Sequence, residues 1–201
     1  HCQILHKVHS CLPSVDNLLF DSEYDQMPNN CSELNNPKTN LLQITPEIEK
    51  LIDQALLEDI SGGDVTTDAL LSHDQLGKAA IVPRADGVLA GIDVAEAIFK
   101  RVDITCKWRV LLKDGSRIIP RESSIGIGHY EPLAEISGSM ASILKAERTA
   151  LNFVQHLSGI ATETRKYVDA VQGCDVRILD TRKTIPGLRS LEKYAVRAGG
   201  G

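Results

Sequence analysis

The stretch that decides the fold of this chain is RILDTRKTIPGLRSLEKYAVRAGGG, residues 177–201. Its apolar beginning predicts a short buried strand over residues 176–179. Ile185-Pro186-Gly187 predicts a turn, because Pro fixes φ and Gly tolerates positive φ. Apolar residues then recur at spacings of three and four, which predicts a helix through Leu188, Leu191, Ala195 and Ala198. A strand, a turn and a helix in this order are typical of parallel α/β structures.

The loop predicted between this strand and this helix is rich in cations. It contains Thr181-Arg182-Lys183-Thr184, and residues 177–197 hold six Arg and Lys residues against two acidic ones. In parallel α/β proteins such a loop lies at the carboxyl edge of the sheet, where ligands bind. Arg can grip a carboxylate through two parallel hydrogen bonds, and Lys adds a compact charge. The loop therefore predicts a site for a small, multiply anionic ligand, with a solvated surface loop as the alternative.

The composition argues against several other classes of protein. The 201 residues carry a net charge of −5, which gives no support for binding to nucleic acid or to a membrane surface. No apolar run reaches the roughly 18 residues that a membrane span needs. The five cysteines are an odd number without CxxC spacing, which argues against a zinc site and a complete disulfide framework. We therefore expect a reducing, cytoplasmic setting.

Residues 1–44 differ from the rest of the chain. They are rich in Asn and Pro, hold three of the five cysteines and contain one short apolar cluster, residues 15–20. We expect an extension that is poorly ordered, because it has little apolar surface to offset the loss of chain entropy. His1, His6 and His9 have no regularly spaced carboxylate or thiolate beside them, so they are not assigned as a metal site.

Residues 45–157 predict an α+β domain. Thr45-Pro46 favours a helix start, because Thr caps helices well and Pro suits the first helical position. Asp114-Gly115 lies between two apolar stretches and predicts a hairpin over residues 108–119. The other predicted elements are a polar loop at 58–67, strands at 78–83, 88–91 and 133–136, and a helix over 94–102.

A long helix completes this domain, from a cap at Ser139 to Leu157. Glu147 falls within its apolar stripe and is expected either to form a structural ion pair or to face a ligand cleft. A neighbouring polar face of the same helix contains Arg148, Asn152 and Gln155.

The remaining residues, 158–201, predict the first part of a second domain. Ser158-Gly159 is expected to end the long helix, and Gly173 to end a second helix that leads into the strand at 176–179. One helix–strand–helix unit cannot bury both faces of a parallel sheet, which needs several strands. We therefore expect this chain to be cut inside its second domain.

Four motifs of the chain stand out: EDISGGDVTT (58–67), ERTALNFVQHLSGIATETRKYVDAV (147–171), ILDTRKTIPGLR (178–189) and EKYAVRAGGG (192–201). Together they resemble one enzyme family, quinolinate phosphoribosyltransferase, also called nicotinate-nucleotide pyrophosphorylase (carboxylating). The resemblance covers roughly residues 46–201, and its last two motifs are highly specific.

The resemblance implies both a fold and a reaction. The fold is an N-terminal α+β sandwich domain followed by an incomplete α/β barrel of the TIM type, assembled as a homodimer or a higher oligomer. The reaction joins quinolinate to phosphoribosyl pyrophosphate and yields nicotinate mononucleotide, pyrophosphate and CO2, a late step of de novo NAD synthesis. Mg²⁺ accompanies the pyrophosphate, and the family's ligands for it are not expected in this chain.

The resemblance also implies roles for four residues. Thr181, Arg182 and Lys183 match the family's quinolinate-contacting triplet, and Arg148 matches an arginine that reaches into the neighbouring subunit's site. We expect Arg182 to grip a carboxylate in a bidentate pair and Lys183 to add charge, so that these two are the catalytic residues.

Other side chains are expected to support these four. Asn152 and the long helix would hold Arg148 in place. Lys193 and Arg197 are expected to interact with the C-terminal dipole of their own helix rather than with substrate.

The end of the chain departs from the family pattern. The family continues after the triple glycine with an Asn-His-Arg segment, a later Lys, then Glu and Asp on further strands, and none of these is present here. Two alternatives therefore stay open. One is a catalytically inactive isoform that only pairs with full-length subunits, and the other is a related pyrophosphorylase that uses another substrate.

Overall fold

The computed structural model of the protein describes residues 42–60, 75–119 and 131–201. The predicted extension lies outside these ranges except for its last three residues, and so do His1, His6 and His9. Most of the polar loop predicted at 58–67 also lies outside them. The predictions for these segments stay predictions.

A three-stranded antiparallel sheet forms one layer of the fold. Its order is β1 (Leu76–Ile81), β5 (Ala134–Ser139) and β3 (Lys107–Val110), so the central strand comes last in the chain. Burial alternates along the start of β5, where Ala134 and Ile136 are buried and the residue between them is exposed. This alternation is the pattern of a strand with one face on the core. The strands predicted near 78–83 and 133–136 are confirmed.

The hairpin predicted over residues 108–119 is wrong. The turn itself is present, since Gly115 has φ 81° and Ser116 N donates to the Lys113 carbonyl oxygen at 3.1 Å. The strands beside it pair elsewhere, β3 with β5, and β4 (Arg117–Ile118) with β2 (Gly87–Val88). Long-range pairing overrides the local turn: β3 lies against the central strand β5, and Trp108 of β3 packs on Phe99 with ring centroids 5.3 Å apart.

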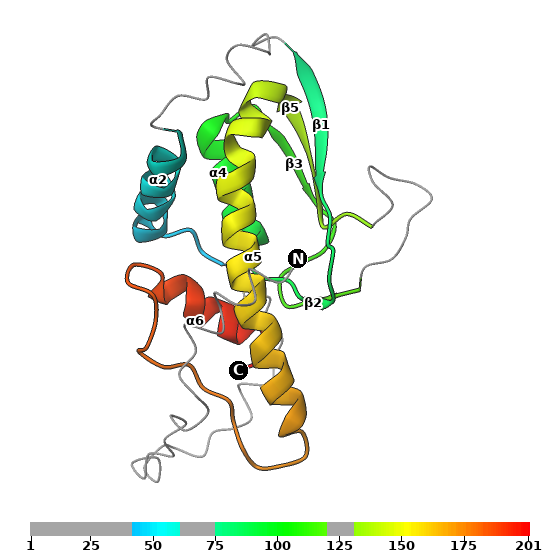
Figure 1. Ribbon diagram of the computed structural model, residues 1–201, viewed down its shortest axis with the longest axis vertical. Helices are drawn as coiled ribbons and strands as arrows, with labels where there is room; N and C mark the ends of the chain where they lie inside the picture. Colours follow the sequence, from blue (N-terminus) through cyan, green and yellow to red (C-terminus); the bar gives the residue numbers. More distant parts are fainter. Residues whose placement is uncertain (1–41, 61–74, 120–130) are drawn as a thin grey trace. The chain divides into compact units, whose positions relative to one another are not determined.

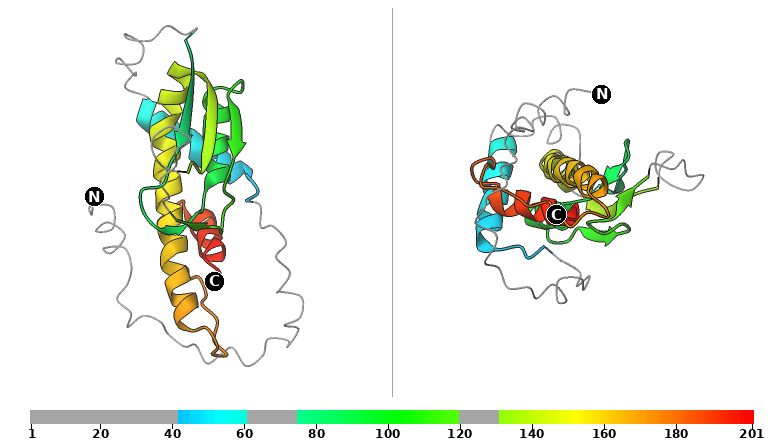
Figure 2. Two further views of the ribbon diagram at one scale, coloured as in Figure 1. Left: turned by 90° about the vertical axis from the view of Figure 1, so that its right-hand side faces the viewer. Right: turned by 90° about the horizontal axis from the view of Figure 1, so that it is seen from below.

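Two helices, α4 (Ile92–Val102) and α5 (Met140–Ala170), lie between the sheet and a third helix, α2 (Pro46–Ile60), as the views in Figure 1 and Figure 2 agree. Apolar side chains from all three helices and the sheet form one core. The helix start predicted at Thr45 is confirmed, because its hydroxyl accepts a hydrogen bond from Ile48 N at 3.4 Å. None of the described helices is long and apolar enough to cross a membrane.

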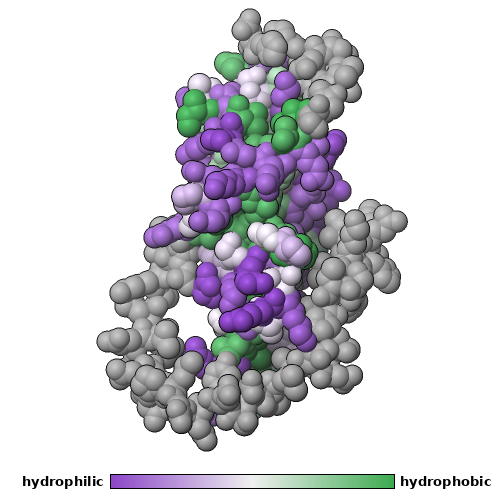
Figure 3. Space-filling model, turned by 90° about the vertical axis from the view of Figure 1, so that its left-hand side faces the viewer, coloured by the Kyte–Doolittle hydropathy of each residue, from purple (hydrophilic) through white to green (hydrophobic). Residues whose placement is uncertain are grey.

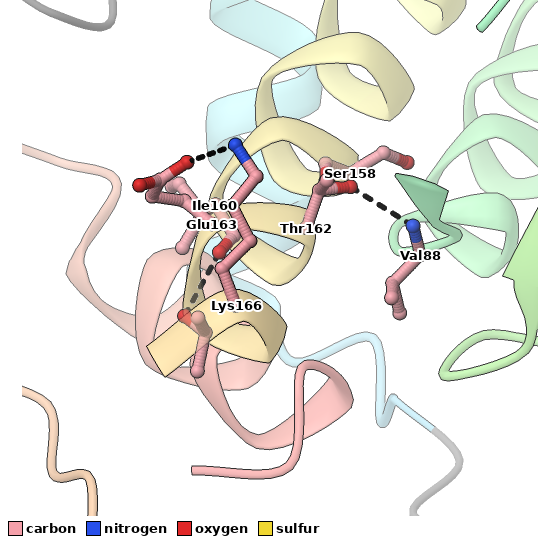
Figure 4. A network of polar contacts seen from close by, with 7 residues as sticks. Val88, Ser158, Ile160, Thr162, Glu163 and Lys166 are labelled. Carbon is pink, nitrogen blue, oxygen red and sulfur yellow. Dashed lines mark hydrogen bonds and ion pairs between the residues drawn. The ribbon is translucent and has the colours of Figure 1, made fainter. Parts of the chain in front are cut away.

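Helix α5 runs straight through Ser158-Gly159, where the sequence predicted an end. The Ser158 hydroxyl accepts a hydrogen bond from Ala90 N at 3.0 Å and donates to the Ala90 carbonyl oxygen at 3.1 Å. One turn later the Thr162 hydroxyl accepts from Val88 N at 2.9 Å, as Figure 4 shows. A glycine inside a helix lowers helix stability by only about 1 kcal/mol. The hydrogen bonds of Ser158 and Thr162 with backbone groups at the end of β2 and beyond it outweigh this loss, so the helix continues.

The strand predicted over residues 176–179 is also wrong. The chain from 176 to 180 is neither helix nor strand, and Val176 and Leu179 are each 46% exposed. A parallel strand needs neighbouring strands to pair its backbone and cover both faces, and none of the described residues supplies one here. The helix after the turn is confirmed as α6 (Arg189–Ala198), which packs on α5 through Leu191 and Ala195. Mixed helix and antiparallel sheet agree with the α+β part of the predicted fold class.

Candidate active site

Helix α6 is fixed firmly to the core. The Tyr194 hydroxyl donates to Asp114 Oδ2 at 2.7 Å, and the same carboxylate accepts from the backbone N–H groups of Gly91 and Ile92 at 2.6 and 3.1 Å. Burial, then the neighbouring Asp114, raises the pKa of Tyr194 well above its ordinary value, so the phenol stays protonated and donates. One carboxylate therefore joins the Asp-Gly turn, the start of α4 and the middle of α6.

The loop before α6, residues 180–188, carries the predicted substrate triplet; we call it the cationic loop. Lys193 Nζ binds Asp180 Oδ1 at 2.6 Å where the loop begins, and Ile185 N donates to Glu192 Oε2 at 3.3 Å after the triplet. Inside the loop, Lys183 N donates to the Thr181 hydroxyl at 3.1 Å. Thr181 thus shapes the backbone beside Arg182 and Lys183, as a Ser/Thr turn does.

Both cations of the triplet are open to solvent. Arg182 and Lys183 are exposed, and neither forms an ion pair with any residue that the structure describes. The face of the molecule that carries α2 and α6 is dominated by hydrophilic side chains, as Figure 3 shows. An exposed guanidinium and an exposed ammonium on adjacent residues, with no carboxylate partner among the described residues, can bind two anionic groups of one small ligand.

Arg148 lies on α5 and is held by a residue that the sequence did not indicate. Its Nη1 binds Asp59 Oδ1 at 2.9 Å, and the Thr149 hydroxyl lies 3.4 Å from the other oxygen of that carboxylate. Asp59 lies at the end of α2, and no hydrogen bond or ion pair among the described residues joins Arg148 to Asn152, so the predicted support by Asn152 stays a prediction. The Arg148 side chain is 76% exposed, so most of its hydrogen-bonding fork remains available.

The structure groups Thr181, Arg182 and Lys183 on one loop but does not connect Arg148 to them by any hydrogen bond or ion pair among the described residues. Along α5, Arg148 precedes His156 by eight residues, which is about 12 Å of helix rise. His156 is the residue of α5 that contacts α6 beside the loop, with Nε2 3.0 Å from Glu192 Oε1. Within one chain, Arg148 on α5 and the triplet on the loop before α6 are thus joined by no contact among the described residues.

Two further predictions concern Lys193 and Glu147. Lys193 was assigned to the helix dipole, but it binds Asp180 and so anchors the cationic loop. Glu147 is exposed and lies at the edge of a small cavity of about 160 Å³, which is lined mainly by apolar side chains of β1, β5 and α5. Glu147 makes no ion pair with a described residue. Of the two roles predicted for it, the structural ion pair is therefore not supported.

The described residues contain no group of three or more His, Cys, Asp or Glu side chains that could hold a metal ion. The acidic groups nearest the triplet are already engaged, Asp180 by Lys193 and Glu192 by His156 and Ile185 N. Mg²⁺ takes oxygen ligands, and both of these carboxylates already have partners among the described residues.

Two family models match the chain. One is described as "Quinolinate phosphoribosyl transferase, N-terminal domain" and matches residues 64–158. The other is described as "Quinolinate phosphoribosyl transferase, C-terminal domain" and matches residues 160–201.

Several curated proteins are similar in sequence. The chain is 45% identical over 153 residues to the nicotinate-nucleotide pyrophosphorylase [carboxylating] of Mycobacterium leprae. The aligned residues make up 75% of this chain and 51% of that protein. It is 40% identical over 155 residues to the probable nicotinate-nucleotide pyrophosphorylase [carboxylating] of Bacillus subtilis, covering 77% and 50%. The chain thus spans about half the length of the curated relatives it matches.

Solved structures are similar as well. NadC from Streptococcus pyogenes matches with a TM-score of 0.72 at 40% identity, over 80% of this chain and 54% of that one. The nicotinate-nucleotide pyrophosphorylase from Francisella tularensis matches with a TM-score of 0.69 at 37% identity, over 81% and 56%.

Proposed function

This chain belongs to the quinolinate phosphoribosyltransferase family, and we propose that it takes part in transferring a phosphoribosyl group from phosphoribosyl pyrophosphate to quinolinate. The products are nicotinate mononucleotide, pyrophosphate and CO2. The observation that carries the proposal is the exposed Arg182-Lys183 pair on a loop whose own carboxylate, Asp180, is taken by Lys193. No observation on the described residues favours an inactive isoform or another substrate.

The cationic loop suits quinolinate because this substrate carries two adjacent carboxylates. Arg182 would bind one of them in a bidentate pair, and Lys183 would add a point charge to the other. With the dicarboxylate held, the ring nitrogen attacks the anomeric carbon and displaces pyrophosphate, which leaves with the bonding electron pair. The carboxylate beside the ring nitrogen then leaves as CO2, and the electron pair left on the ring carbon takes up a proton from water. Catalysis by these residues is then positioning and charge stabilisation rather than covalent chemistry.

We propose that the protein forms a homodimer or a higher oligomer, in which Arg148 completes the anion site of the neighbouring subunit. Two features of Arg148 support this: its side chain is 76% exposed, and Asp59 engages only one of its terminal nitrogens. The incomplete α/β barrel also belongs to this proposal. The domain boundaries at 44/45 and 157/158 stay predictions.

Two expectations from the resemblance stay proposals. Mg²⁺ would arrive with the pyrophosphate group of the second substrate, and no step is assigned to it here because the described residues offer it no ligand cluster. Cytoplasmic location is likewise proposed from composition alone; among the relatives, some from Nicotiana carry "mitochondrial" in their names.

The test of this function is release of labelled CO2 from carboxyl-labelled quinolinate, measured with and without phosphoribosyl pyrophosphate, beside direct binding of quinolinate. The proposal expects quinolinate to bind and any CO2 release to require both substrates. Nicotinate, which has one carboxylate, is the matched control ligand. Equal affinity for nicotinate and quinolinate would contradict the proposal, because the second carboxylate of quinolinate would then contribute nothing to binding.

A further inference from the structure

Two consecutive residues of α6 hold the two flanks of the substrate triplet. Lys193 binds Asp180 immediately before Thr181, and Glu192 accepts a hydrogen bond from Ile185 N after Thr184. Successive helical residues point about 100° apart, so the two side chains leave the helix in different directions. Two side chains from one turn of α6 therefore hold the loop on both sides of residues 181–184.

Glu192 does more than accept this one hydrogen bond. Its second oxygen, Oε1, lies 3.0 Å from His156 Nε2 on α5, and its side chain is only 12% exposed. One carboxylate thus ties the end of the cationic loop to both α5 and α6. Such a bridge holds the loop backbone in place without contributing a group to the exposed face on which Arg182 and Lys183 lie.

The loop needs a brace of this kind for two reasons. Arg182 and Lys183 repel each other, and Val176 and Leu179 at its entrance are 46% exposed and contribute little burial. A bidentate contact works only if the guanidinium is held in the correct place before the ligand arrives, because ordering a loop on binding reduces affinity. Backbone position at Ile185 therefore controls how well the two cations meet a dicarboxylate.

We propose that Glu192, held by His156, is a positioning residue that fixes the cationic loop for dicarboxylate binding. The proposal rests on the proposed function for the identity of the ligand. We call the contacts of Glu192 with His156 and with Ile185 N the clamp. The clamp does not depend on the proposed function, because it is supported by the distances among these three groups. Glu192 is not a catalytic residue, since it acts through the backbone of the loop.

The test compares Glu192→Ala and Glu192→Gln with the parent chain and with Glu163→Ala. Glu163 is a matched control, because it forms an exposed pair with Lys166 on α5 and has no hydrogen bond or ion pair with the cationic loop among the described residues. The first readout, without ligand, is amide hydrogen exchange of Ile185. The second is quinolinate affinity by titration calorimetry, with thermal unfolding to verify that each variant is folded.

Glu192→Ala is expected to speed exchange at Ile185 about tenfold or more, since a hydrogen bond to a charged acceptor is lost. Quinolinate affinity should fall by about three- to tenfold. Glu192→Gln keeps an acceptor for the amide and should rescue much of both effects, whereas Glu163→Ala should change neither. Faster exchange in Glu192→Ala with unchanged quinolinate affinity would overturn the positioning role, and unchanged exchange would overturn the clamp.

A parent chain that binds no quinolinate would refute the proposed function instead. In that case the exchange rate of Ile185 alone decides the inference: a faster rate in Glu192→Ala supports the clamp and an unchanged rate overturns it.

Discussion

Similar apolar residues occur in two parts of the molecule, the region around α4 and α5 and the segment between α5 and α6. Only the first region buries them. Leu157 on α5 is fully buried, with its side chain against Gly91, whereas Leu179 is 46% exposed. The first region is where α4, α5 and the strands of the sheet pack on one another, whereas residues 176–180 belong to no helix or strand. An apolar run therefore becomes a buried element only where other elements are present to cover it.

The largest expected effect comes from one substitution made in both regions. Leu157→Ala should lower the free energy of unfolding by about 3 kcal/mol, because it removes buried methyl groups and leaves a cavity. Leu179→Ala should change it by less than about 0.5 kcal/mol, as surface substitutions usually do. Urea unfolding monitored by circular dichroism measures both. A Leu179→Ala variant as unstable as Leu157→Ala would show that residues 176–179 are packed after all.

A smaller loss is expected at the carboxylate that joins α6 to the first region. Asp114→Ala leaves the N–H groups of Gly91 and Ile92 and the Tyr194 hydroxyl without their acceptor. The free energy of unfolding should fall by about 2 kcal/mol at neutral pH. Asp86→Ala is the control, since Asp86 is exposed and close in sequence to β2. If the two variants were equally stable in urea, Asp114 would not anchor α6.

The smallest of these effects is expected for Tyr194→Phe, which removes one hydrogen bond and keeps the ring. The free energy of unfolding should fall by about 1 kcal/mol at pH 7. The folded-state pKa of Tyr194 is raised above its unfolded value, mainly by burial and then by Asp114. The stabilisation that its protonated form gives is therefore complete below about pH 10 and is lost as the pH rises beyond it.

The matching measurement is urea unfolding of the parent and Tyr194→Phe chains at neutral pH and above pH 10. The difference between them should shrink in the alkaline range, because the parent then loses stability that the variant does not have. A constant difference at every pH would mean that Tyr194 titrates alike in both states.

Sequence reasoning succeeded where the signal is local. Thr45-Pro46 marks the start of α2, and the turn at Asp114-Gly115 is present, because caps and turns depend on adjacent residues. It failed where distant contacts decide. Ser158 and Thr162 bind the backbone near β2, about seventy residues earlier in the chain, and so keep α5 continuous across Gly159.

The candidate site shows the same division. The motif places Thr181, Arg182 and Lys183 on one loop, because they are adjacent in the chain. The groups that hold this loop and Arg148 had no local signal. His156 and Glu192 are 36 residues apart in the sequence, and Asp59 and Arg148 are 89 apart. Only the packing of α5 on α6 and on α2 brings these pairs together.

The central claim is that the cationic loop binds the two carboxylates of quinolinate, and the most direct test is calorimetric titration of quinolinate into the parent and Arg182→Lys chains. Arg182→Lys keeps the charge but loses the planar fork, so affinity should fall about ten- to hundredfold. Folding should be unaffected, because Arg182 is exposed and unpaired among the described residues. An Arg182→Lys chain that binds quinolinate as tightly as the parent would contradict the claim.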